Sequence, residues 1–314
     1  MLRPTNPLLS IVVPCFNEEA VIVQTLNALG RAIPAIPEVR AEIICVDDGS
    51  SDTTLTLLRT AAAGDARVRV VALSRNFGHQ LALTAGLDAA RGDAVVIIDA
   101  DLQDPPEVIE RMVARWRDGV DVAFGVRTRR SGETAFKRGT AHLFYRLMRA
   151  MSSSDISMDA GDFRLLDRAV VEALRTLPER DRFVRGLVSW VGFRQEGVPY
   201  ERNSRAGGET KYPFRRMLNF ALDGIFSFSA MPLRLATYLG LLVSFASVIG
   251  IGYALWVRFF IASVVPGWAG QWIGTMFLGG VQLLSLGIIG EYVGRIYGEV
   301  KSRPLYVVRE RIGF

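Results

Sequence analysis

The first part of the chain alternates between short, almost continuously apolar runs and longer stretches with helical spacing. Such β-branched runs are typical of strands buried on both faces of a parallel sheet. Ser51 or Asp52 can cap the second helical stretch. The predicted strands span 8–14, 41–48, 67–74, 93–101 and 121–126, and the predicted helices span 18–31, 53–63, 80–90 and 135–151. We therefore predict an α/β fold with an open, mainly parallel sheet.

Two long uncharged runs follow near the C-terminus. The run 235–257 has 23 residues, so as a helix it would be about 34 Å long, enough to cross a bilayer core of about 30 Å. A second uncharged run starts at Trp272, and Pro266 and Gly267 lie in the turn between the two. A buried core helix is the alternative, but flanking Trp, Tyr and Arg residues favour membrane spans. We predict a two-helix transmembrane hairpin, with helices at about 235–257 and 272–292.

Basic residues indicate the orientation of this hairpin. They crowd its two outer flanks, whereas the connecting loop, 258–271, holds only Arg258. The positive-inside rule then places both termini and the α/β domain in the cytoplasm, at a bacterial-type inner membrane. The segment 212–232 is amphipathic and Phe-rich, so it is expected to lie along the membrane surface. The predicted parts are a cytoplasmic domain (1–211), this segment, the two spans (233–294) and a basic tail (295–314).

Composition narrows the choice of partners. The net charge is +5 and the pI is near 9.5, but no Lys/Arg-rich run with interleaved aromatic residues indicates nucleic acid. Anionic lipid headgroups and phosphorylated substrates fit the placement of the basic residues better. With two histidines and two cysteines in all, a zinc site of the usual kind is excluded. Cys15 and Cys45 are expected to be buried free thiols, although they could meet if their strands are neighbours.

Polar residues follow each predicted strand, at the edge where ligands bind in such sheets. Asn17 and Glu18 follow the first strand, and Asp48 ends the second. The first strand is followed by PCFNEEA, which contains no glycine, so the G-x-G-x-x-G pattern of a dinucleotide-binding oxidoreductase is missing. For Asp48 we favour contact with a nucleotide. Asp52 is expected to serve mainly as a helix cap.

Two carboxylates are spaced one residue apart in VVIIDADLQDPP. Alternate side chains of a strand share a face, so Asp99 and Asp101 are expected to converge on one point. Two oxygen ligands in a partly open site suit Mg²⁺ or Mn²⁺ bridging to substrate phosphates. Gln103 is a further candidate ligand, or a hydrogen-bonding partner of the metal's water shell. Two solvated loop residues are the alternative.

Several motifs together carry a family resemblance. They are SIVVPCFNEE, VDDGSSDTT, SRNFGHQLALTAGLDAARGD, IDADLQDPPE, GDFRLLDR and GETKYP. This set resembles the glycosyltransferase family 2 enzymes, and most closely their polyisoprenyl-phosphate branch, which includes dolichol-phosphate mannose synthase and bacterial undecaprenyl-phosphate glucosyltransferases. The resemblance implies a GT-A nucleotide-binding fold with a D-x-D metal motif. It also implies inverting transfer of a sugar from a nucleotide diphosphate to a polyprenyl phosphate, with UDP-glucose favoured as donor and GDP-mannose open.

The resemblance also assigns roles to residues. Asp162 is the implied candidate for orienting or deprotonating the acceptor, or else it pairs structurally with Arg164. A lipid phosphate is already ionised near neutral pH, so its site needs arginines more than a strong base. Gln80 is expected to start its helix and to pack, and His79 could reach a substrate, although a capping or packing role is favoured. The expected contacts with the acceptor phosphate are Arg127, Arg130, Arg205 and Lys211, and the expected catalytic residues are Asp162, Asp101 and Arg127. The expected contacts with the donor nucleotide are Pro14, Asn17, Glu18, Asp48, Asp99 and Ala100. The expected metal ligands are Asp99, Asp101 and Gln103.

Other functions compete with this one. A processive polysaccharide synthase of the same superfamily would carry Q-x-x-R-W and more spans, but here Met112 stands three residues before Arg115-Trp116. A non-catalytic nucleotide-binding membrane anchor would not need the D-x-D pair or the basic residues. Small residues in both spans are compatible with packing inside the hairpin or between chains, so a homo-oligomer stays open.

Overall fold

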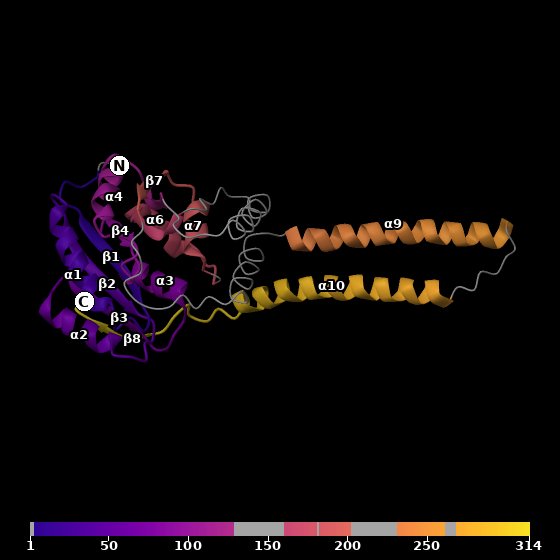
Figure 1. Ribbon diagram of the computed structural model, residues 1–314, viewed down its shortest axis with the longest axis horizontal. Helices are drawn as coiled ribbons and strands as arrows, with labels where there is room; N and C mark the ends of the chain where they lie inside the picture. The colour runs from indigo at the N-terminus through magenta and orange to yellow at the C-terminus, as the bar shows by residue number, and fades with distance from the viewer. Residues whose placement is uncertain (1–2, 129–159, 181, 202–230, 261–267) are drawn as a thin grey trace. The chain divides into compact units, whose positions relative to one another are not determined.

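A mixed β-sheet with helices on both faces organises the N-terminal part of the protein (Figure 1). The computed structural model describes residues 3–128, 160–180, 182–201, 231–260 and 268–314. The chain divides into two units, the first with all described residues up to 201 and 303–314, the second with those between 231 and 302. The strands are β1 (Leu8–Cys15), β2 (Arg40–Asp47), β3 (Val68–Leu73), β4 (Ala94–Ile97), β5 (Val122–Arg127), β6 (Ala160–Asp167), β7 (Gln195–Tyr200) and β8 (Val308–Ile312). The helices of the first unit are α1 (Ile22–Ala32), the 3-10 turn η1 (Ile33–Ala35), α2 (Thr54–Gly64), α3 (His79–Ala89), α4 (Val108–Arg117), α6 (Arg168–Thr176) and α7 (Val184–Trp190).

The sheet has eight strands within the described residues, in the order β7-β5-β6-β4-β1-β2-β3-β8. Strands β4, β1, β2 and β3 run parallel, as do β5 and β7. Strand β6 is antiparallel to both of its neighbours, β4 and β5, and β8 is antiparallel to β3. The predicted α/β fold with a mainly parallel sheet is confirmed. The sequence analysis predicted none of β6, β7 and β8.

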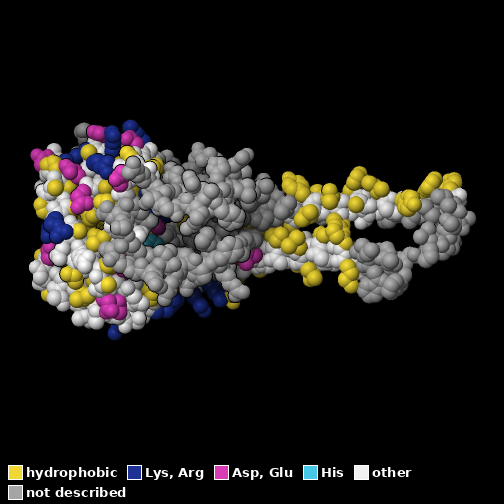
Figure 2. Space-filling model, in the orientation of Figure 1, with side chains coloured by type: hydrophobic (Ala, Val, Ile, Leu, Met, Phe, Trp, Pro, Cys, Tyr) yellow, Lys and Arg dark blue, Asp and Glu magenta, His cyan; other side chains and the backbone are white. Residues whose placement is uncertain are grey.

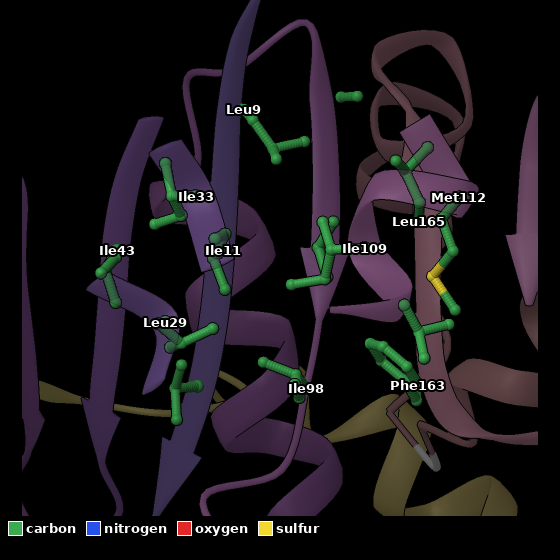
Figure 3. Close-up of a cluster of buried hydrophobic side chains, with 14 of the residues drawn as sticks. Leu9, Ile11, Leu29, Ile33, Ile43, Ile98, Ile109, Met112, Phe163 and Leu165 are labelled. Carbon is green, nitrogen blue, oxygen red and sulfur yellow. The ribbon is translucent and has the colours of Figure 1, made fainter. Parts of the chain in front are cut away.

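The central strands are buried on both faces. On one face Ile11 packs with Leu29 of α1 and Met112 of α4, in the cluster shown in Figure 3. On the other face the adjacent Val12 packs with Leu83 of α3. All five side chains are fully buried. This double burial is why the strands read as continuous apolar runs rather than as alternating ones.

Strand β4 is shorter than predicted. It ends at Ile97, so Asp99 and Asp101 lie in the following turn rather than on a strand. Leu102, with a φ of 56°, lies in the left-handed region within that turn. The expectation that strand alternation aims the two carboxylates at one point was therefore wrong, because pairing ends at Ile97, before the apolar run ends at Ile98.

The second unit contains two long helices, α9 (Met231–Phe260) and α10 (Trp268–Val300), which contact each other. Hydrophobic side chains lie along the surface of both (Figure 2). Among the described residues one stretch, Gly274–Val300, is long and apolar enough to cross a membrane, whereas the apolar run in α9, Ala236–Gly250, is shorter. The structure thus supports one of the two predicted spans, and the hairpin stays a prediction. Residues 212–230 of the predicted surface segment lie outside the described residues.

A glycine sets how closely α3 approaches the sheet. A Cβ placed on Gly86 would lie 2.2 Å from Cγ1 of Val12 and 3.2 Å from Cγ2 of Val46. Both valines are fully buried in the sheet. Any larger residue at position 86 must therefore push α3 away from β1 and β2, and these strands lead directly into the polar loops described below.

Replacing Gly86 by alanine is expected to lower the free energy of unfolding by about 1–3 kcal/mol, because the added methyl group overpacks Val12. The matched control is Gly30→Ala in α1, where a Cβ meets no atom within 4 Å. That substitution should be neutral or stabilising by up to about 1 kcal/mol, since alanine is the better helix former. Thermal unfolding of the purified full chain measures both, and equal midpoints would contradict the close α3–β1 packing.

Candidate functional site

The loops after β1 and β2 are joined by hydrogen bonds from polar side chains. Oδ1 of Asn17 accepts the Ser51 N–H at 2.8 Å, and the Glu18 N–H donates to Oγ1 of Thr54 at 2.9 Å. Asn17 itself has a φ of 54°, a left-handed conformation that asparagine tolerates. The two loops therefore form one rim at the carboxyl end of the parallel strands, where ligands bind in such sheets.

Asp48 extends this rim to the loop after β3. Its two carboxylate oxygens accept the N–H groups of Phe77 and Gly78, at 2.8 and 2.9 Å. The side chain is buried, and burial raises the pKa of Asp48 although these two hydrogen bonds lower it. Gly49, with a φ of 69°, is needed next to it, because a Cβ there would lie 2.4 Å from the carbonyl carbon of Arg75. Three consecutive β–α loops are thus held in one arrangement.

Asp99 lies in the turn after β4, and one of its two carboxylate oxygens is unusual in its surroundings. Its side chain is 33% exposed, but Oδ1 is inaccessible to water and has no hydrogen-bond partner within the part of the chain that the structure describes. Burial raises the pKa of Asp99 to about 6, and the charges of Asp162, Asp101 and Asp104 also raise it, whereas His79 lowers it. An ionised oxygen without a donor is costly, so this atom is suited to receive a cation.

The pairing of β4 with β6 brings Asp162 close to Asp99. Ile97 is paired with Arg164, so Asp99, two residues later, and Asp162, two residues earlier, lie at corresponding places in the antiparallel register. His79, the first residue of α3, lies between them. Its Nε2 is 3.7 Å from Oδ1 of Asp99 and 3.4 Å from Oδ2 of Asp162. His79 therefore faces two carboxylates, so the favoured capping or packing role does not account for its position, and its contact with a substrate stays a prediction.

Positive charge surrounds Asp162. Nη2 of Arg185 lies 3.2 Å from Oδ1 of Asp162, and Arg164 is buried nearby with its pKa lowered by burial to about 10. Burial alone would raise the pKa of Asp162, but the hydrogen bond with His79 and the charges of Arg185 and Arg164 hold it well below its usual range. Burial likewise lowers the pKa of His79, and Asp162 and Asp99 more than offset this and raise it. Asp162 is therefore ionised at neutral pH and is a weak proton acceptor.

Arg127, at the end of β5, is held by a second polar network. Its Nε donates to the Tyr200 hydroxyl at 3.3 Å, and its Nη2 is 3.9 Å from Oδ1 of Asp104. The Tyr200 hydroxyl in turn donates to Asp104, a buried carboxylate. Gly161 leaves room for the guanidinium, since a Cβ there would lie 2.9 Å from Nη2. Gly161 and Asp162 are consecutive on β6 and so face opposite sides of the strand, and Arg127 lies on the side of Gly161, with Tyr200 and Asp104.

The carboxylates at this edge fit a divalent cation. No group of three or more His, Cys, Asp or Glu side chains among the described residues forms a ready-made metal cage. Mg²⁺ and Mn²⁺ bound with nucleotides seldom need one, because substrate phosphates and waters supply most of their ligands. The unpartnered Oδ1 of Asp99 meets this demand, with Asp101 two residues away. The Gln103 N–H donates to Oδ1 of Asp101 at 3.1 Å, so Gln103 contributes at least its backbone to this turn.

The structure brings together only some of the predicted residues. Asp99 and Asp162 lie on either side of His79, whereas Arg127 belongs to the network of Tyr200 and Asp104, and Pro14 and Ala100 are buried. Oγ1 of Thr25 donates to the Ala100 carbonyl at 2.6 Å. The predicted contacts Arg130, Arg205 and Lys211 lie outside the described residues. All assigned roles in substrate binding stay predictions.

Sequence reasoning missed Arg185 and Tyr200 and undervalued His79. The position of His79 could have indicated its role, since it follows the predicted strand 67–74 and so lies at the same edge of the sheet as the carboxylates. Arg185 and Tyr200 gave no such signal, because they come from α7 and β7, which pack beside the site only through long-range contacts.

The chain is similar in sequence to known glycosyltransferases. The family model described as glycosyl transferase family 2 matches residues 10–175. An uncharacterised glycosyltransferase of Bacillus subtilis, YkcC, is 48% identical over 97% of this chain and 94% of that protein. A bactoprenol glucosyl transferase of Shigella phage SfX is 42% identical over 96% of this chain and 99% of that protein. Among solved structures, the mannosyltransferase PcManGT of Pyrobaculum calidifontis, in complex with GDP-Man and Mn²⁺, is 17% identical over 90% of this chain and 87% of that chain, with a TM-score of 0.47.

The resemblance found in the motifs is thus confirmed at nearly full length. The matched family region begins in β1 and ends in α6, so it contains the loops after β1, β2 and β4 as well as Asp162. The fold is the GT-A type, with a mixed and mostly parallel sheet. On the family match and the identity to full-length relatives, the chain belongs to glycosyltransferase family 2.

Proposed function

We propose that the protein transfers a hexose, with glucose favoured, from a nucleotide diphosphate sugar to a polyprenyl phosphate, with inversion at the anomeric carbon. The observation that carries this proposal is the arrangement of Asp99 and Asp162 around His79, in which Oδ1 of Asp99 has no hydrogen bond among the described residues and lies 3.7 Å from the imidazole. The acceptor is supported by the likeness to a protein named bactoprenol glucosyl transferase and by the apolar stretch Gly274–Val300. UDP-glucose is the donor that we favour.

The donor occupies the rim formed by the loops after β1, β2 and β4. Asn17, Glu18 and Asp48 contact the nucleotide, and Asp99 and Asp101 hold Mg²⁺ or Mn²⁺ beside its diphosphate. When bound, the cation neutralises the charge that builds up on the leaving diphosphate. The hydrogen bonds that join these loops keep the groups in place before the donor arrives, so little reorganisation is needed during transfer.

The acceptor phosphate approaches from the side of Arg127. Its second pKa is about 6, so it is already an anion near neutral pH and needs positioning rather than deprotonation. Arg127 is oriented by Tyr200 and Asp104 and supplies a fixed guanidinium. Asp162 is a weak base, because the neighbouring cations hold its pKa well below its usual range. Its role is therefore to orient His79 and Arg185, not to remove a proton.

The membrane arrangement is part of the proposal. Residues around α9 and α10 anchor the protein in a bacterial inner membrane through two spans, with the catalytic unit and both termini in the cytoplasm. Nucleotide sugars are then available on the side where the site lies. The apolar, exposed stretch of α10 supports the anchoring.

The direct test is an assay of the purified full chain with labelled UDP-glucose, other UDP-sugars and GDP-mannose, each with a short-chain polyprenyl phosphate. We expect lipid-linked glucose from UDP-glucose, no product with the corresponding polyprenyl alcohol, and loss of product when a chelator removes divalent cations. Product with GDP-mannose alone would replace the donor assignment. Absence of any lipid-linked sugar would contradict the proposed function.

Asp99→Asn is expected to reduce transfer at least about 100-fold, because it removes a charged oxygen at the leaving group. The same variant should keep its thermal midpoint without metal, because burial raises the pKa of Asp99 and its negative charge therefore does not stabilise the folded protein. Mn²⁺ together with UDP should raise the midpoint of the unsubstituted protein but not that of Asp99→Asn.

The matched control for this prediction is Asp118→Asn, which changes an exposed carboxylate at the end of α4. It should transfer at the unsubstituted rate and keep its stabilisation by Mn²⁺ with UDP. Equal stabilisation of Asp99→Asn by the metal would contradict the metal assignment even if its activity were low.

A further inference from the structure

Arg185 is placed by the first turn of α3, although the two helices are far apart in sequence. Oε1 of Gln80 accepts the N–H of Val184, the first residue of α7, at 2.9 Å. His79, the preceding residue, faces Asp162. Consecutive side chains of α3 therefore hold both the candidate catalytic carboxylate and the helix that delivers Arg185 to it. The expectation that Gln80 serves the start of its own helix did not account for this contact.

The guanidinium of Arg185 has more N–H donors than its ion pair with Asp162 uses. Its Nη2 pairs with Asp162 at 3.2 Å, and it lies 5.8 Å from the ring centre of Phe183. Its Nε is inaccessible to water and has no hydrogen-bond partner among the residues described, yet 28% of the side chain is exposed. A guanidinium has five N–H donors in a planar fork. The guanidinium is thus fixed at one end and open at the other, as expected of a site that binds an anion.

The charge balance around Asp162 points the same way. This one carboxylate faces Arg185, the fully buried guanidinium of Arg164, and His79. His79 also faces Asp99, so its charge is shared between two carboxylates. Of the two arginines, Arg164 is fully buried and Arg185 is partly exposed, so a phosphate with a charge of about −1.5 to −2 can reach Arg185.

We propose that Arg185 binds the phosphate of the acceptor lipid while one nitrogen stays on Asp162. This inference rests on the proposed function. Arginine forks bind phosphate through two parallel hydrogen bonds, which fixes orientation as well as position. His79 lies between Arg185 and Asp99, the carboxylate assigned to the donor diphosphate. The phosphate nearest to Arg185 is therefore that of the acceptor.

The test compares Arg185→Ala and Arg185→Lys with Arg194→Ala, in the full chain, with UDP-glucose and a short-chain polyprenyl phosphate. Arg194 is an exposed arginine just before β7 and serves as the matched control. For Arg185→Ala we expect the KM for the polyprenyl phosphate to rise at least about tenfold, as for loss of a hydrogen bond to a charged group. The KM for the donor should stay within about twofold, and Arg185→Lys, which keeps the charge but not the fork, should be intermediate. Arg194→Ala should match the unsubstituted protein.

Each outcome of this comparison supports or contradicts the proposed role of Arg185. A donor KM that rises while the acceptor KM is unchanged would assign Arg185 to the diphosphate and overturn the proposal. A fall in kcat with both KM values unchanged would show that Arg185 only holds Asp162, and would also overturn it. If Arg185→Ala does not fold, the acceptor KM of Arg185→Lys gives the answer. Failure of the proposed function is a separate outcome, since the unsubstituted protein would then make no lipid-linked sugar.

Discussion

The antiparallel pairing of β6 with β4 is the constraint on which the site depends. β6 lies between β4 and β5 and runs antiparallel to both of them. In a parallel strand Asp162 would lie at the end of the sheet away from Asp99, whereas the observed register sets the two carboxylates at matching heights. Arg164, at the strand position paired with Ile97, is then buried directly behind the site. One reversal thus supplies both a second carboxylate and the cation that keeps it ionised.

Around Asp99 and Asp162, most of the polar side chains described above form hydrogen bonds with other groups of the protein. Asp48 binds two backbone N–H groups, Asn17 binds the next loop, and Tyr200 binds Asp104 and orients Arg127. Oδ1 of Asp99 and Nε of Arg185 are among the seven buried polar atoms without a hydrogen bond in the described part of the chain, and they belong to the side chains that face His79 and Asp162. Buried polar atoms are normally hydrogen-bonded, so these two are the positions in the site that suit a cation and an anion. The rigidity of the rest makes these two positions well defined.

Local patterns were sufficient for the parallel half of the fold and insufficient for the remainder. The runs leading to β1, β2, β3 and β5 are continuous and apolar because both faces of these strands are buried, and such runs can be recognised without knowing their neighbours. The turn at Asp99 was mistaken for strand, because the apolar run of β4 extends past Ile97 and only the loss of pairing ends it. Asp162 was identified through a family resemblance, whereas Arg185 and Tyr200 needed the three-dimensional pairing of segments far apart in sequence. Side chains that reach the site through pairing of distant segments cannot be recognised from periodicity in the sequence.

The last strand shows the same principle at the opposite edge of the sheet. β8 follows the apolar helix α10 in sequence but pairs with β3, so the first unit is completed only by residues at the far end of the chain. The Ser74 N–H donates to the Val307 carbonyl at 2.9 Å, immediately before the loop whose Phe77 and Gly78 hold Asp48. Covering an edge strand protects it from pairing with other chains. Here it also fixes the end of β3 from which the nucleotide rim is built. Because this contact spans more than 230 residues, it forms after the local β–α units and couples the order of the rim to the presence of the segment beyond α10.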